Sequence, residues 1–124
     1  MKVKPQKSTQ EDRTLFWVEQ DGCILLWQRA ATARLMPGFW ELPERTQLPD
    51  VDGPLIATFR HGITYHNYRF SVVSASAPTD LGECQWVEKT ELLRMPISTV
   101  LKKAYRLVER AVALPGQAVP ARAS

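Results

Sequence analysis

The chain has 124 residues, of which 44% are hydrophobic and 23% are charged, a composition typical of one soluble globular domain. No apolar run approaches the roughly 20 residues that cross a bilayer, and the polar N-terminus excludes a secretory signal. We therefore expect a cytoplasmic monomer with no membrane partner. The net charge of +3 allows a polyanionic partner without requiring one.

The cysteine content excludes two kinds of covalent or metal framework. Cys23 and Cys84 are isolated, and neither belongs to a Cys-x-x-Cys pair. A disulfide framework and a tetrahedral zinc site would both lack the residues they need. We expect two free thiols, buried or idle.

The first twelve residues combine a proline with polar and charged side chains and contain almost nothing that a core would bury. We predict a flexible linker over residues 1–12. One folded domain is predicted over residues 13–114, with structure beginning near Arg13. The Ala/Pro-rich residues 115–124 are expected to be disordered.

Two runs rich in aromatic and aliphatic residues, 14–20 and 23–29, are separated only by Asp21 and Gly22. Asp-Gly is a favoured two-residue hairpin turn because both residues tolerate positive φ. We predict an antiparallel hairpin here, followed by a loop over residues 30–37.

The middle of the chain is predicted to hold strands and no long helix. Residues 44–54 contain two prolines and a glycine among polar residues, which excludes a long helix there. Residues 55–60 and 67–75 are predicted strands, the second with apolar residues at every second position from Tyr68. Residues 61–66, between these strands, are predicted to form a loop or tight bend.

Helical signals are confined to the last third of the chain. A short strand over residues 85–87 leads to Thr90, whose hydroxyl is expected to cap a brief helix over residues 91–94. Ser98 opens one long helix, in which apolar residues at helical spacing form a stripe that should pack on a sheet. The pattern predicts an α+β domain.

The order of these elements resembles the opening of the Nudix fold, with Asp-Gly-Cys-Ile-Leu-Leu-Trp-Gln-Arg ahead of Gly-Phe-Trp-Glu-Leu-Pro. The resemblance implies a twisted mixed β-sheet with a short helix and one long C-terminal helix. Nudix hydrolases hold Mg²⁺ on a helix of clustered glutamates, because a pyrophosphate must be neutralised before it is attacked.

The Nudix signature is Gly, five residues, Glu, seven residues, then Arg-Glu-x-x-Glu-Glu-x-Gly. Gly38 and Glu44 match it, but Asp52-Gly53 stands in place of Arg-Glu and Ile56-Ala57 in place of Glu-Glu. Pro54 falls inside what would be the metal-binding helix. We expect no catalytic residue and no metal site in this chain, and the carboxylates of this region are expected to be surface groups.

A Nudix-like sheet without its metal box, preceded by a Lys/Pro linker, resembles the C-terminal domain of MutY-type adenine DNA glycosylases. The matching pieces are Lys-Val-Lys-Pro at 2–5, residues 38–43, Phe-Arg-His-Gly-Ile-Thr-Tyr-His at 59–66, Trp86, and Leu-Lys-Lys-Ala at 101–104. The most diagnostic stretch follows His61. It resembles the family's Phe-Ser-His loop, which detects 8-oxoguanine opposite a mispaired adenine.

The resemblance implies that Ile63 is an apolar wedge, Thr64 supplies a hydroxyl, and Tyr65 takes the third place, where the family commonly has histidine. Oxidation at C8 turns guanine N7 into a donor and adds an acceptor at O8, so a reader needs an adjacent acceptor and donor. The Thr64 hydroxyl accepts and a neighbouring backbone N–H donates. Tyr65 either stacks on a base or reaches a phosphate.

Other residues of this stretch are assigned smaller roles. Gly62 would permit close approach of the backbone to DNA. His61 and His66 belong to the candidate DNA-binding set, although hydrogen-bonded loop histidines have the same appearance in a sequence. A duller interpretation, in which Thr64 caps a turn and Ile63 fills the core, stays open.

The resemblance also implies a larger parent protein. In the family, base removal and an iron–sulfur cluster belong to a helical N-terminal domain, and this chain has neither those helices nor four cysteines. We expect no cofactor in this chain, with the N-terminal glycosylase domain and double-stranded DNA containing 8-oxoguanine as partners. Arg60, Arg69 and Lys7 are the candidate phosphate contacts.

Two other functions stay open at this point. A Nudix hydrolase could act on oxidised nucleotides through an unorthodox metal site. Alternatively, a protein-interaction module could bind a repair partner through its sheet face or its final helix.

Overall fold

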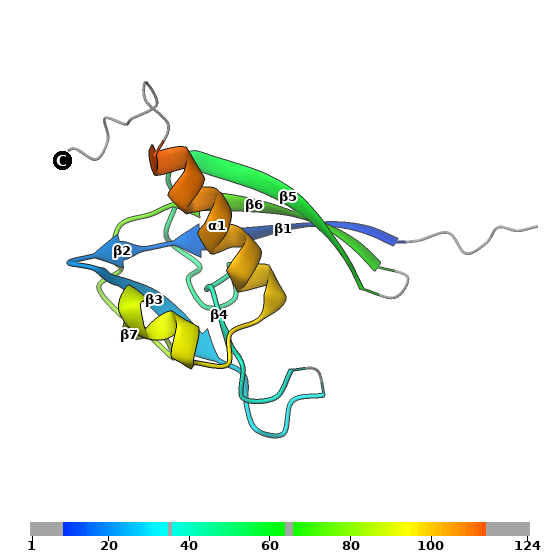
Figure 1. Ribbon diagram of the computed structural model, residues 1–124, viewed down its shortest axis with the longest axis horizontal. Helices are drawn as coiled ribbons and strands as arrows, with labels where there is room; N and C mark the ends of the chain where they lie inside the picture. Colours follow the sequence, from blue (N-terminus) through cyan, green and yellow to red (C-terminus); the bar gives the residue numbers. More distant parts are fainter. Residues whose placement is uncertain (1–8, 35, 64–65, 114–124) are drawn as a thin grey trace, which may run out of the picture.

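The computed structural model describes residues 9–34, 36–63 and 66–113 (Figure 1). Strand β1, Thr9–Trp17, pairs in parallel with β6, His66–Ser74, and β6 pairs antiparallel with β5, Leu55–Ile63. These strands form a three-stranded sheet in the order β1-β6-β5. The linker prediction is wrong for residues 9–12, because their backbone pairs with the start of β6.

A second sheet is built around β3, Cys23–Gln28, which pairs antiparallel with β2, Glu19–Gln20, with β4, Trp40–Glu41, and with β7, Gln85–Glu88. The turn joining β2 to β3 has positive φ at both of its residues, 53° and 80°. The predicted hairpin turn is therefore confirmed. Its predicted first arm is wrong over residues 14–17, which belong to β1 and pair with β6 instead.

Two helical elements follow β7. The first, η1, is a 3-10 helix over Lys89–Arg94, and the second, α1, spans Thr99–Ala113. The predicted capping role of Thr90 is wrong, because η1 begins two residues before the predicted start at residue 91, and its N-cap, Glu88, makes no side-chain cap hydrogen bond. No helix in the described ranges is long and apolar enough to span a membrane.

Helix α1 lies across one face of the three-stranded sheet, as Figure 1 shows. Its apolar stripe is confirmed, because Leu101, Ala104 and Val108 are buried in one cluster with residues of β1 and β6. A second cluster covers part of the opposite face. It contains Phe16, Val18, Leu25, Leu48, Val73 and Cys84. One end of the β5–β6 hairpin projects beyond α1 and the second sheet (Figure 1).

Ser98 connects α1 to the second sheet. Its Oγ accepts a hydrogen bond from the Leu101 backbone N at 3.0 Å, which is the geometry of an N-cap and agrees with the predicted start of the helix at Ser98. The same hydroxyl donates to Glu41 Oε1 at 2.6 Å, and Ser98 is only 3% exposed. One buried side chain thus satisfies a helix terminus and a strand carboxylate.

Ser98→Ala should lower the free energy of unfolding by about 1–2 kcal/mol, because the helix loses its cap and Glu41 loses a donor. Urea denaturation followed by circular dichroism measures this change. Thr99→Ala is the matched control, since Thr99 is the exposed next residue. Equal effects of the two substitutions would contradict the capping role.

Candidate nucleic-acid interface

Strands β5 and β6 form a hairpin in which the strand pairing continues up to the residues that join the strands. Arg60 pairs with Arg69, and the ladder runs on to the pair of Ile63 with His66. The predicted loop over residues 61–66 is therefore wrong for 61–63 and 66, which belong to the strands. Only Thr64 and Tyr65 join the strands, and both lie outside the described residues.

Lys7, the third candidate phosphate contact, also lies outside the described residues. Its contact with DNA stays a prediction from the sequence. The same holds for the contacts predicted for Thr64 and Tyr65.

The hairpin end of the sheet has one face of polar and small residues. Side chains alternate between the two faces of a sheet, and directly paired residues share a face. The register of the three strands therefore places one set of residues together, which we call the polar face: Gln10, Asp12, Thr14, Thr58, Arg60, Gly62, Asn67, Arg69 and Ser71. Seven of these nine are exposed and two are half-buried, so this face is open to a partner.

Two arginines stand directly opposite each other on the polar face. Arg60 and Arg69 are cross-strand partners, an arrangement in which like charges repel and destabilise a free sheet. Arg69 Nε lies 3.2 Å from Asp12 Oδ1 in a solvent-exposed ion pair, while Arg60 has no ion pair among the described residues. The pair therefore leaves a net positive charge that an external anion would neutralise.

The opposite face of the hairpin is a row of aromatic rings. His66 stacks on Tyr68 at 5.9 Å between ring centroids, and Tyr68 stacks on Phe70 at 5.6 Å. Phe70 is buried and also stacks on Phe59 at 5.3 Å. The Arg13 guanidinium lies over the Tyr68 ring, 5.7 Å from its centroid. The row extends from the core to the hairpin end and holds the hairpin in place.

The predicted site residues therefore divide between two faces. Arg60, Gly62 and Arg69 lie on the polar face, whereas His61 and His66 lie on the aromatic face with α1. Sequence reasoning found the core-facing alternation at Tyr68, which is confirmed, but did not extend it to His66. Extending the alternation of period two from Tyr68 back to His66 would have placed His66 on this face.

His61 is linked to the final helix. Lys103 Nζ lies 3.0 Å from His61 Nδ1. Partial burial, and then the charge of Lys103, lower the pKa of His61 below its ordinary 6.5. The folded chain therefore favours the neutral imidazole, with Nδ1 accepting a hydrogen bond from the lysine.

Stability should consequently fall as the pH drops below about 6.5, because the unfolded chain then takes up a proton at His61 that the folded chain disfavours. His61→Gln should show a smaller loss of stability between about pH 7.5 and about pH 5.5 than the unchanged chain. Urea denaturation at each pH measures it. Lys103→Gln should also reduce the pH-dependent loss of stability, and Lys102→Gln should not. Identical behaviour of these two variants would contradict an interaction between His61 and Lys103.

The residues at the Nudix-box position do not fit a magnesium site. Segment 44–54 contains no helix, as predicted. Glu44 is held by Arg13 at 2.8 Å, and Glu41 by Arg29 at 2.7 Å, so guanidinium groups already neutralise both carboxylates. Within the described ranges, no group of three His, Cys, Asp or Glu side chains is arranged to hold a metal ion.

Both cysteines are free thiols, as predicted, with Cys84 buried and Cys23 half-buried. Burial, and then the charge of Glu83, raise the pKa of the Cys84 thiol to about 11. Cys84 therefore stays protonated at neutral pH and is a poor nucleophile.

Comparison with known proteins identifies the fold of the chain through solved structures alone. No protein-family model matches the sequence, and no curated protein matches it significantly. Among solved structures, the MutT protein of Methanosarcina mazei Go1 matches with a TM-score of 0.70 at 15% identity, over 86% of this chain and 98% of that one. The chain has a Nudix-like fold. The predicted fold class is thus confirmed.

Two further solved structures match over similar shares of the chain. The C-terminal domain of mouse MUTYH, solved in complex with human PCNA, matches with a TM-score of 0.59 at 22% identity, over 87% of this chain and 93% of that one. The E. coli ORF135 protein matches with a TM-score of 0.60 at 20% identity, over 87% and 96%. At these identities the likenesses establish the fold and leave the function open.

Proposed function

We propose that the chain recognises 8-oxoguanine in duplex DNA through the hairpin end of β5 and β6, and so serves an adenine DNA glycosylase in base excision repair. The observation that carries the proposal is the cross-strand pair of Arg60 and Arg69 on the open polar face. Phosphates are the anions best suited to such a pair, because each guanidinium offers several fixed donors. DNA bound there lies beside the residues that join the two strands.

The lesion itself is read at the junction between the strands. Thr64 presents a hydroxyl that accepts from N7–H of 8-oxoguanine, and an adjacent backbone N–H donates to O8. Undamaged guanine lacks O8 and would leave the backbone N–H unpaired, at a cost of about 1–3 kcal/mol. Gly62 is exposed and places no side chain between the backbone and the DNA.

The glycosidic chemistry belongs to another part of the proposed parent protein. None of the described carboxylates forms a metal group, and Glu41 and Glu44 are engaged by arginines. The proposed role is therefore recognition, with base removal supplied by an N-terminal glycosylase domain that carries the iron–sulfur cluster. The mouse MUTYH likeness supports this assignment at the level of the fold.

The test compares binding to three fluorescent duplexes that carry 8-oxoguanine:A, G:A or G:C at one position. The unchanged chain should prefer the lesion duplex, and Thr64→Ala should lose about 1–3 kcal/mol of that preference. Thr79→Ala, an exposed residue of a distant loop, should retain it. Equal binding of all three duplexes by the unchanged chain would remove the proposal.

A second candidate function is hydrolysis of oxidised nucleotides. It is favoured by the TM-score of 0.70 with the MutT protein of Methanosarcina mazei. The missing glutamate ligands argue against it, since pyrophosphate attack needs a bound divalent cation. Release of phosphate or pyrophosphate from a nucleotide panel with Mg²⁺ would establish this function in place of lesion recognition.

A further inference from the structure

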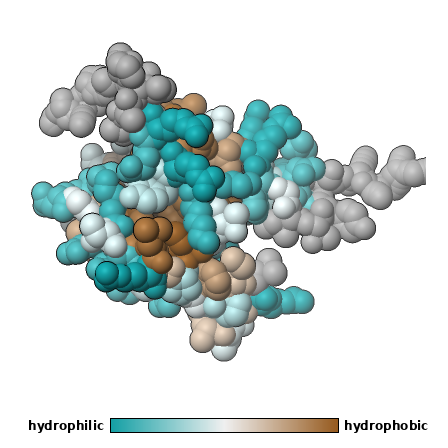
Figure 2. Space-filling view, in the orientation of Figure 1, coloured by the Kyte–Doolittle hydropathy of each residue, from teal (hydrophilic) through white to brown (hydrophobic). Residues whose placement is uncertain are grey.

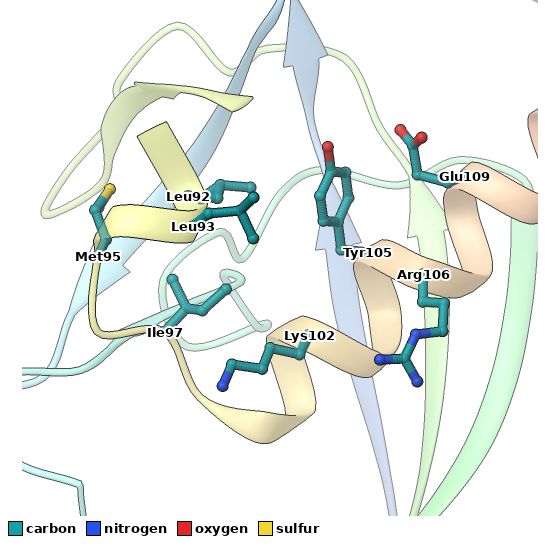
Figure 3. A pocket seen from close by; sticks show the side chains of 8 residues that line it. All are labelled: Leu92, Leu93, Met95, Ile97, Lys102, Tyr105, Arg106 and Glu109. Carbon is teal, nitrogen blue, oxygen red and sulfur yellow. The ribbon is translucent and has the colours of Figure 1, made fainter. Parts of the chain in front are cut away.

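A groove is lined by residues of η1, of α1 and of the segment that joins them (Figure 3). Its volume is about 490 Å³, within the range of pockets that hold a ligand or inserted side chains. Leu92, Ile97 and Tyr105 line its floor, and Figure 3 shows the two leucines of η1 pointing toward Tyr105. The groove is separate from the polar face.

The floor of the groove is apolar, and one exposed leucine stands beside it. Leu92 and Ile97 are buried, but Leu93 beside them is 91% exposed, which no packing requirement of this chain explains. Figure 2 shows a hydrophobic area next to the hydrophilic strip of α1. A large apolar side chain in an apolar hollow with a charged rim is typical of a protein-binding surface.

The rim of the groove carries positive charge. Lys102 and Arg106 lie one helical turn apart on α1, and neither has an ion pair within the described ranges. The negative charge of Glu109, also at the rim, contributes to the raised pKa of Lys89. The Nζ of Lys89 lies 2.7 Å from Glu19 Oε2. The two unpaired cations therefore remain available to a partner's carboxylates.

We propose that this groove binds a short amphipathic segment of a partner protein, in which apolar side chains enter beside Leu93 and acidic side chains pair with Lys102 and Arg106. This is the mode in which an amphipathic segment lays its apolar face into a groove. The chain's own termini do not fit, because residues 1–8 and 114–124 contain lysines and an arginine and no acidic residue. The proposed occupant is therefore an acidic segment outside residues 1–124.

Three labelled synthetic peptides test the proposal by fluorescence polarisation. The first is an amphipathic Leu/Glu peptide, the second replaces its leucines by serine at unchanged charge, and the third replaces its glutamates by lysine. The first should bind about tenfold more tightly than the second and more tightly than the third. Equal binding of the first two peptides would mean general charge attraction and would overturn the proposal.

Matched variants of the chain locate the contact. Leu93→Ser should weaken binding of the Leu/Glu peptide about tenfold, whereas Leu55→Ser, at a leucine that is 60% exposed elsewhere, should not. Arg106→Ala should weaken it about threefold, as expected for an exposed ion pair, and Arg110→Ala should not.

Amide shift mapping gives the remaining outcomes. Shifts confined to residues 92–97 and 102–109 on adding the Leu/Glu peptide support the proposal. Two results would overturn it. One is self-association of the chain through these residues, detected by sedimentation, and the other is duplex DNA, rather than the peptide, shifting the amides of Lys102 and Arg106.

Discussion

Reversing both charges on the polar face, in the double variant Arg60→Glu/Arg69→Glu, should lower the affinity for duplex DNA at least roughly tenfold at about 50 mM salt. Each arginine that contacts a phosphate releases about one counterion on binding. The slope of log affinity against log salt concentration should therefore become shallower by about two. Fluorescence anisotropy over a salt series measures both quantities.

The matched control is Arg94→Glu/Arg110→Glu, which changes the net charge equally at two exposed arginines elsewhere in the chain. It should leave the salt slope within about half a unit of the original, because general charge attraction acts weakly at a distance in salt. If the two double variants weakened binding to the same extent, the polar face would have no special role in DNA binding.

The second large effect concerns the loop that occupies the Nudix-box position. A Cβ added to Gly53 would overlap the carbonyl oxygen of Ser74 at the end of β6. The contact is backbone to backbone, and the next residue, Pro54, accepts a hydrogen bond from the Ser74 N at 2.9 Å. Gly53→Ala should therefore lower the free energy of unfolding by about 3 kcal/mol, since a backbone cannot yield as a side chain can.

Gly62→Ala is the control for this second prediction. A Cβ there would lie 3.2 Å from the Asn67 side-chain oxygen, which can move aside, and 3.8 Å from the His66 backbone oxygen, an ordinary van der Waals contact. Its free energy of unfolding, from urea denaturation of both variants, should change by less than about 1 kcal/mol. A Gly53→Ala variant as stable as Gly62→Ala would show that the loop does not pack against β6 in this way.

Local chemistry explains the parts of the fold that could be predicted from the sequence. The turn at Asp21 and Gly22 follows from tolerance of positive φ, and the start of the long helix at Ser98 follows from the apolar stripe that begins after it. The alternation from Tyr68 to Phe70 places one face of β6 in the core. Each of these signals lies within a few residues of the feature that it predicts.

Pairing between strands far apart in the sequence explains the parts of the fold that could not be predicted. Residues 9–12 are polar and resemble a linker, and they become a strand only because β6, more than fifty residues later, offers a parallel partner. The opposition of Arg60 and Arg69 likewise depends on hairpin register, which a sequence read as a loop over 61–66 does not reveal. The polar face, and with it the candidate site, emerges only when three strands are aligned.

The most direct test of lesion recognition is the difference in backbone amide shifts when the chain is titrated with matched duplexes that contain 8-oxoguanine:A or G:A. We predict that both duplexes shift amides along the polar face, including Arg60 and Arg69, and that only the lesion duplex adds large shifts at residues 62–66. Identical shift patterns for the two duplexes, or lesion-dependent shifts confined to residues outside this hairpin, would contradict the account.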